Sequence, residues 1–159
     1  MKSHPLSKSD SNVILGEISS QWNIELPKLK TLILYEIDEN TSLITSENFT
    51  IVKIDGIHVP FLSETSLLEK FPKVVVDAGA IKFVCNGANV MRPGIKKFTE
   101  FKKDDLVCIV EETHNKFLAV GKAMVSSDEM QNITKGEMVK NLHYISDKYW
   151  ESAKLIKKN

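Results

Sequence analysis

The chain has 159 residues, of which 42% are hydrophobic and 26% charged, and its 21 basic and 21 acidic side chains give a formal net charge of zero. This composition is ordinary for a soluble globular protein. No apolar run approaches the ~20 residues of a membrane span, the polar start lacks a signal-peptide core, and two cysteines form neither a disulfide framework nor a zinc knuckle. We therefore expect one large or two small domains in the cytoplasm, without membrane attachment.

The beginning of the chain predicts one helix. The first nine residues look disordered, and Asp10 is expected to act as the N-cap of a helix in which Ile18 and Trp22 repeat at helical spacing.

The rest of the first half predicts a small antiparallel sheet and a short helix. Strand-like runs occupy residues 31–37, 42–46 and 49–54. Asp55-Gly56 is the two-residue signal of a hairpin that leads into a further strand. Ser63 is expected to cap a helix over 64–70, which must end before the following proline. The first half is therefore an α+β unit.

The second half predicts a barrel of short strands with one short helix. After an apolar strand at 73–76, Asp77 caps a helix that Gly87 ends in the left-handed conformation. Pro93 and Gly94 suit the central positions of a type II turn. Three further strand-like runs complete a small, mostly antiparallel barrel, at 106–112, 116–125 and 138–145. The basic end of the chain, 153–159, is expected to be frayed.

Glycine and positive charge are concentrated in the same stretch. Three of the seven glycines lie in "DAGAIKFVCNGANVMRPGI", residues 77–95, and residues 78–103 carry a net charge of +5. Gly79 falls in the first turn of the expected helix, where glycine costs up to ~1 kcal/mol relative to alanine. Two explanations remain open at this point. Another segment packs tightly against the bare turn, which is the more frequent case, or a phosphate backbone approaches it.

This stretch, together with "AVGKAMVSSDEM" and "KGEMVKNLHYISDKYW", closely resembles the PUA domain, the pseudouridine synthase and archaeosine transglycosylase module. Within that superfamily the chain is most similar to the malignant T-cell-amplified-sequence (MCT) family of translation factors and its archaeal counterparts. The resemblance covers roughly residues 73–152 and is much weaker over 1–60. It implies an α+β fold with an N-terminal mixed antiparallel domain (1–72), a C-terminal PUA pseudobarrel (73–152) and a basic tail (153–159).

The resemblance also implies an RNA-binding function. The expected contact residues are Gly79, Ala80, Lys82, Asn86, Gly87, Ala88, Arg92, Pro93, Lys96 and Lys97. Among them Arg92 is expected to hold phosphate in a bidentate fork, because guanidinium geometry suits it. The implied partners are structured RNA (tRNA acceptor or small-subunit rRNA), the small ribosomal subunit and a SUI-type translation factor. The implied role is ribosome recycling or reinitiation.

Catalysis finds little support in the sequence. The four histidines and two cysteines show no metal-ligand spacing, so we expect no catalytic residues, no metal and no cofactor. Tyr144 and Trp150 either stack on bases or, as base rates favour, close the barrel together with His143. The alternative function is a non-catalytic accessory subunit or interaction module of an RNA-modification or ribosome-assembly complex.

Overall fold

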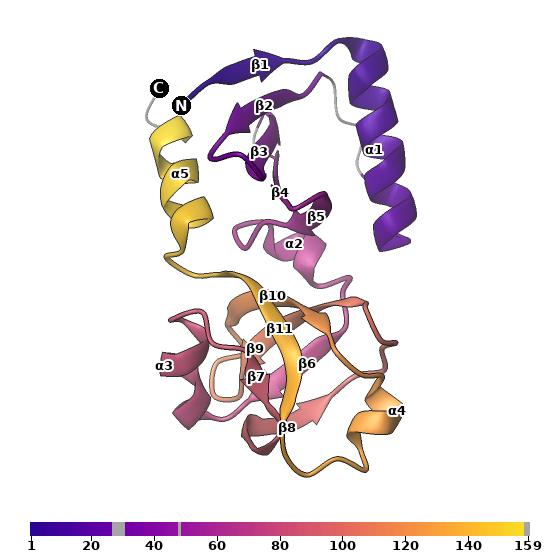
Figure 1. The fold of residues 1–159 in the computed structure, drawn as a ribbon, viewed down its shortest axis with the longest axis vertical. Coiled ribbons are helices and arrows are strands. Elements are labelled where there is room, and N and C mark those ends of the chain that lie inside the picture. Colours follow the sequence, from indigo (N-terminus) through magenta and orange to yellow (C-terminus); the bar gives the residue numbers. More distant parts are fainter. Residues whose placement is uncertain (27–30, 48, 158–159) are drawn as a thin grey trace.

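The computed structural model describes residues 1–26, 31–47 and 49–157, and it consists of two sheets stacked end to end (Figure 1). The first sheet and its helix α1 form the upper body in this view, and the second sheet curls into the barrel below. The described elements are β1 (Ser3–Pro5), α1 (Lys8–Trp22), β2 (Ile33–Glu36), β3 (Thr41–Ser46), β4 (Phe49–Ile54), β5 (Ile57–Pro60), α2 (Thr65–Leu68), β6 (Lys73–Val76), η1 (Ala78–Ala80), α3 (Ile81–Val84), β7 (Val90–Met91), η2 (Arg92–Gly94), β8 (Ile95–Phe98), β9 (Leu106–Glu111), β10 (Phe117–Ala123), α4 (Ser127–Met130), β11 (Glu137–Tyr144) and α5 (Lys148–Lys157).

The N-terminal sheet has the antiparallel order β1-β2-β3-β4-β5, which confirms the three strand-like runs and the hairpin. Asp55 and Gly56 both have positive φ, as a two-residue hairpin of primed type requires. The expected disorder of the first nine residues is wrong, because β1 pairs with β2 and α1 already begins at Lys8. The N-cap is Ser7, whose Oγ accepts the main-chain N–H of Asp10 at 3.0 Å. Sequence reasoning placed the cap three residues late, since both side chains are good caps.

Helix α2 also begins differently from expectation. Ser63 does not cap it; the helix follows Glu64, which makes no side-chain capping bond there. The carboxylate of Glu64 instead accepts the main-chain N–H of Thr50 at 3.1 Å, so it ties α2 to the sheet. The helix ends at Leu68, ahead of Pro72, as expected.

The C-terminal sheet has the order β7-β11-β10-β9-β6-β8 and forms a nearly closed pseudobarrel. All its pairs are antiparallel except β6 with β9, which run parallel, so the segments that follow these two strands emerge at the same end of the barrel. A bulge interrupts the β10–β11 ladder at Val120/Gly121. A Cβ on Gly121 would lie 2.6 Å from the carbonyl oxygen of Lys140, so only glycine permits this close strand approach.

The turn between β7 and β8 corrects one expectation. Arg92–Gly94 forms a single turn of 3₁₀ helix, and Gly94 does not adopt the positive φ of a type II turn. Pro93 is compatible with both, because its fixed φ suits the start of a helical turn as well.

Two apolar cores stabilise the molecule. One fills the barrel, and the other is shared between the N-terminal domain and the outer face of the barrel. In the shared core Cys108, Val110 and Val120 of β9 and β10 pack with residues such as Leu68 of α2. Buried Cys108 donates its S–H to the carbonyl oxygen of Leu68 at 3.7 Å, and burial raises the pKa of its thiol to about 12. The two domains are therefore one continuous packed unit.

A buried imidazole joins the two domains. His143 of β11 is fully buried, and its Nε2 accepts the main-chain N–H of Leu62 at 3.1 Å. Because a main-chain N–H can only donate, Nδ1 carries the ring proton and donates it to Oδ2 of Asp147 at 2.7 Å. Phe61 stacks on the imidazole at 5.0 Å and on Trp150 at 5.7 Å between ring centroids. Phe61 and Trp150 belong to the shared core, so this aromatic stack joins strand β11 to the N-terminal domain.

The chain ends in a helix, so the expected frayed end is wrong through Lys157; residues 158–159 lie outside the described part. Asp147 caps α5, because its Oδ1 accepts the main-chain N–H of Trp150 at 2.8 Å. Tyr149 and Ala153 are buried in the shared core, and exposed Lys148 pairs with Asp38 at 2.7 Å. The helix therefore packs back on the N-terminal domain.

We predict that Asp147→Ala lowers the free energy of unfolding by about 2 to 4 kcal/mol. The substitution removes the acceptor of three donors, which are the His143 ring and the main-chain N–H groups of Tyr144 and Trp150. Urea unfolding checks this prediction. Lys154→Ala is the control on the same helix, because its ion pair with Glu151 is exposed and is worth at most about 1 kcal/mol. Equal losses of stability from the two substitutions would contradict the proposed role of Asp147 in joining β11 to α5.

A second histidine makes stability depend on pH. His58 is only 3% exposed, its Nδ1 lies 3.2 Å from Oε1 of Gln21, and burial, assisted by the charge of Lys53, lowers its pKa. The unfolded imidazole takes up a proton near pH 6.5, whereas the folded one resists it. The unfolded state therefore binds more protons below that pH, and stability falls as the pH falls.

We expect the free energy of unfolding to decrease by up to about 1.4 kcal/mol per pH unit from pH ~6.5 down to the lowered pKa of His58. His58→Gln should flatten this dependence over the same window. Urea unfolding of both proteins from about pH 5 to about pH 8 measures the difference. Parallel pH profiles would show that His58 is not responsible.

Candidate functional site

The glycine-marked helix start is open to solvent. Asp77 Oδ1 accepts the main-chain N–H of Ala80 at 3.0 Å, which confirms Asp77 as the cap, although the first turn is the 3₁₀ segment η1 rather than α-helix. Gly79 is exposed. A Cβ added to it would meet only Asp77 Oδ1, at 3.3 Å. Packing by another segment does not explain this glycine.

The η2 turn lies directly beside η1. Gly94 accepts the main-chain N–H of Asp77 at 2.9 Å, and a Cβ on Gly94 would lie 3.4 Å from the Cβ of Ala80. Pro93, next to Gly94, is exposed. The two glycine-bearing turns, 15 residues apart in sequence, therefore form one low surface at the end of the barrel.

Gly87 ends α3 for two physical reasons. Its φ of +94° is unfavourable for other residues, and a Cβ would meet the ring of Tyr144 at 3.1 Å. Its N–H bonds the carbonyl oxygen of Val84, while Asn141 of β11 donates its amide to the carbonyls of Val84 and Ala88, both at 3.0 Å. Here internal packing accounts for the glycine, in contrast to Gly79.

Arg92 has a structural role that sequence reasoning did not predict. Its Nε donates to the carbonyl oxygen of Met130 at 3.0 Å, and one Nη donates to that of Ile95 at 3.4 Å. The guanidinium also lies over the ring of Phe98, 5.8 Å from its centroid. Arg92 thus holds α4 and β8 to the η2 turn, and its phosphate contact stays a prediction.

The predicted lysines do not share one face. Lys82 of α3 and Lys96 of β8 are exposed, with Lys96 at the bulged position of its strand. Lys97 lines a separate hollow of about 500 Å³ with Val75 and Phe117 on the outer face of the sheet. Because β8 is an edge strand, a bulge and two lysines also protect it from pairing with another chain.

The structure adds neighbours that the sequence did not indicate. Phe83, next to Lys82 on α3, is 62% exposed, and Met91 of β7 is 48% exposed. Apolar residues of short elements are expected to face a core, so the sequence gives no signal that Phe83 and Met91 are exposed. An exposed aromatic ring beside a cation is suited to stacking on a nucleobase.

The β9–β10 turn lies at the same end of the barrel. The N–H of Glu112 donates to the carbonyl oxygen of Val76, the residue before Asp77, at 3.1 Å. Buried Glu111 shapes this turn by accepting the N–H groups of Thr113 and His114 at 2.8 and 2.6 Å. Burial alone would raise the pKa of Glu111, but these main-chain donors and Lys116 N–H outweigh it and lower that pKa. This turn connects two strands that the sequence predicts, but its proximity to the glycine turns depends on the parallel β6–β9 pair.

The described residues also bear on metal binding, membrane insertion and thiol chemistry. They contain no group of three or more His, Cys, Asp or Glu side chains arranged to hold a metal ion. None of their helices is long and apolar enough to cross a membrane. Cys85 is partly buried on α3, and burial raises the pKa of its thiol.

Comparison with known proteins gives a consistent result. Residues 72–145 match the PUA domain family. Malignant T-cell-amplified sequence 1-A of Xenopus laevis is 33% identical, with 82% of this chain and 76% of that protein aligned. Translation machinery-associated protein 20 of Saccharomyces cerevisiae is 30% identical, with 87% of this chain and 77% of that protein aligned.

A solved structure of a hypothetical protein from Pyrococcus horikoshii superimposes with a TM-score of 0.80 at 33% identity and covers 95% of this chain and 99% of that one. Both the barrel and the N-terminal domain are therefore shared with this archaeal protein. The chain belongs to the family of PUA-domain proteins that includes malignant T-cell-amplified sequence 1 and translation machinery-associated protein 20.

Proposed function

We propose that this chain is a non-enzymatic, cytoplasmic RNA-binding protein of the translation apparatus. It binds structured RNA, either a tRNA acceptor or small-subunit rRNA, during ribosome recycling or reinitiation. The name of the yeast relative supports the link to translation, and the PUA family supports the link to RNA. The N-terminal domain (1–72) is assigned to contacts with a ribosome-bound SUI-type partner, and the PUA domain (73–152) to RNA.

The proposed RNA surface, called the glycine surface below, comprises Gly79, Ala80, Gly87, Ala88, Pro93 and their exposed neighbours Lys82, Phe83, Asn86 and Lys96. The observation that carries the proposal is exposed Gly79, against which no other segment packs and which leaves the main chain accessible. Lys82 and Lys96 supply charge for phosphates, and Phe83 supplies a flat apolar ring for a base. Arg92 contributes chiefly by holding the η2 turn in place.

The glycine surface is suited to an RNA strand rather than to a small molecule, because it is shallow and has lysines at its edge. Phosphate neutralisation makes such binding depend on salt. If three to five phosphates are neutralised, log K should fall with log salt at a slope of about −2 to −4.5. A flat response would instead favour a protein-interaction module.

We predict that Lys82→Gln with Lys96→Gln weakens binding to bulk tRNA or to small-subunit rRNA fragments and flattens the salt slope by about 0.7 to 0.9 for each lysine. Fluorescence anisotropy between about 50 and 200 mM salt measures both quantities. Lys103→Gln is the control, because this exposed lysine lies in the β8–β9 loop, at the end of β9 away from η1. A slope unchanged by the double substitution would contradict the assigned surface.

We further predict that Gly79→Leu reduces RNA affinity while the free energy of unfolding changes by no more than about 1 kcal/mol. Gly79 is exposed and an added Cβ meets only Asp77 Oδ1, at 3.3 Å, so a leucine covers the main chain that RNA would approach and requires only a small shift of that carboxylate. Gly16→Leu is a matched control. Gly16 is exposed on α1, and a Cβ there meets nothing within 4 Å. If both variants bind RNA as the parent does, Gly79 is not part of the interface.

A further inference from the structure

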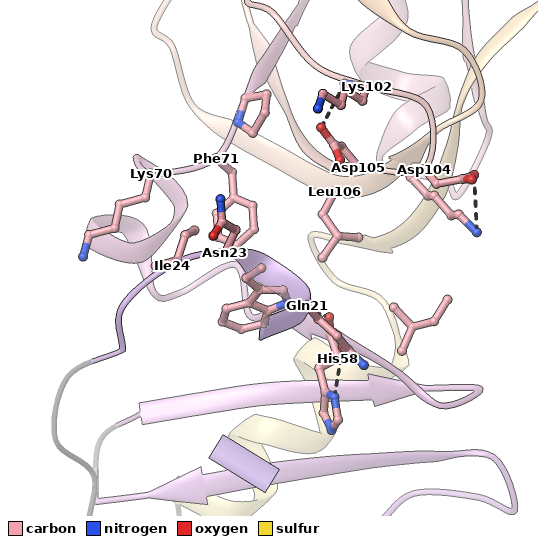
Figure 2. A pocket seen from close by; sticks show the side chains of 14 residues that line it. Gln21, Asn23, Ile24, His58, Lys70, Phe71, Lys102, Asp104, Asp105 and Leu106 are labelled. Atoms are coloured by element: carbon pink, nitrogen blue, oxygen red, sulfur yellow. Dashed lines mark hydrogen bonds and ion pairs between the residues drawn. The ribbon is translucent and has the colours of Figure 1, made fainter. Parts of the chain in front are cut away.

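A sizeable cavity lies between the two domains, away from the glycine surface. This interdomain cleft has a volume of about 640 Å³. The C-terminal end of α1, β5 and the α2–β6 link form one wall, and the β8–β9 loop with β10 forms the other (Figure 2). Its size falls in the range of ligand-binding pockets, roughly 300 to 1,000 Å³.

The floor of the interdomain cleft is apolar and rigid. Trp22 and Phe71 meet edge to face with ring centroids 5.5 Å apart, and Leu106 approaches from the barrel side. The indole N–H of Trp22 donates to the carbonyl oxygen of His58 at 2.9 Å, which fixes the ring. A partner's apolar side chain would find a preformed aromatic contact here, as is typical of interface anchors.

The rim carries unused positive charge. Its two carboxylates already have partners, because Asp104 lies 3.7 Å from Lys122 Nζ and Asp105 accepts the main-chain N–H of Lys102 at 2.9 Å. The ammonium groups of Lys70 and Lys102, on opposite walls, have no carboxylate partner among the described residues. The rim therefore presents two lysines without a carboxylate partner in the described part of the chain, Lys70 on one wall and Lys102 on the other (Figure 2).

A further like-charge contact borders the cleft. Lys122 is directly opposite Lys140 in the β10–β11 register. Like charges in this position are unfavourable in a sheet, and Asp104 relieves only one of them. Charge complementarity thus calls for an acidic partner at this rim.

Several features favour a polypeptide over RNA. The apolar floor suits a side-chain anchor of a polypeptide better than a phosphate backbone, which contacts proteins mainly through charge. The cleft and the glycine surface also lie at opposite ends of β9, since Leu106 borders the cleft and Glu111 leads into the turn beside η1. Figure 1 places α3 and α1 on opposite sides of the molecule. Both surfaces are therefore accessible at once.

We propose that the interdomain cleft is the docking site for an acidic segment of a partner polypeptide. An apolar side chain of that segment inserts beside Trp22 and Phe71, and its carboxylates pair with Lys70 and Lys102. This inference is independent of the proposed RNA function. Because the walls come from both domains, the bound segment also bridges them.

The test titrates the full chain with a peptide of sequence Asp-Glu-Phe-Leu-Asp-Glu whose two ends are blocked. NMR chemical shifts of the protein report the binding. The expected result is a shift of the Trp22 indole resonance and of the Asn23 and Leu106 amides, with the α3 amides unaffected. Lys70→Glu with Lys102→Glu should weaken binding by about tenfold, since two ion pairs become repulsive. Peptides with the acids changed to amides, or with the Phe-Leu pair changed to Ala-Ala, should bind more weakly.

Lys103→Glu is the matched control for Lys102→Glu, because Lys103 is adjacent and exposed but does not line the cleft. Equal losses from the two reversals would overturn the proposal, and so would shifts centred on α3 or no binding at all. If inorganic phosphate or a short oligouridylate shifts the same resonances as strongly, the cleft is an anion or RNA site and the polypeptide assignment is wrong.

Discussion

The hydrogen bond from the Leu62 N–H to His143 Nε2 spans 81 residues of sequence and sets the relation of the two domains. It fixes the proton on Nδ1, which directs that nitrogen to Asp147, and Asp147 in turn starts α5. One buried ring therefore orients the N-terminal domain, the last barrel strand and the final helix together. If one of these buried groups lost its partner, it would carry the full desolvation penalty. The bonds between Leu62 and His143, His143 and Asp147, and Asp147 and Trp150 therefore depend on one another.

Strand β11, which carries His143, also supports the glycine surface. Tyr144, the residue after His143, packs against Gly87, and Asn141 holds the end of α3 through two carbonyls. Successive residues of a strand point to opposite faces. One face of strand β11 therefore contacts the N-terminal domain, and its other face supports the turn at Gly87. The glycine surface and the packing between the domains thus depend on the same strand.

Local signals in the sequence predicted the elements well. The hairpin at Asp55-Gly56, the cap at Asp77 and the left-handed Gly87 each depend on one or two residues with restricted backbone preferences, and each is confirmed. Errors arose where neighbouring residues were equally suitable, as at Ser7, or where one motif fits two turns, as at the Pro93 turn. Long-range consequences were beyond local reasoning. The sequence suggests that Arg92 is free to bind phosphate, whereas in the structure it bonds the carbonyl oxygens of Met130 and Ile95. The interdomain cleft is formed by segments more than 100 residues apart, so no local pattern predicts it.

The return of α5 to the first domain has a consequence for synthesis of the chain. Tyr149 and Ala153 complete a core whose other members begin at Ile18. When only the first 72 residues have emerged from the ribosome, the N-terminal sheet still has part of its apolar surface uncovered. That surface is closed only when the last helix leaves the exit tunnel, so the first domain reaches its full stability after the second one, against the order in which they are translated.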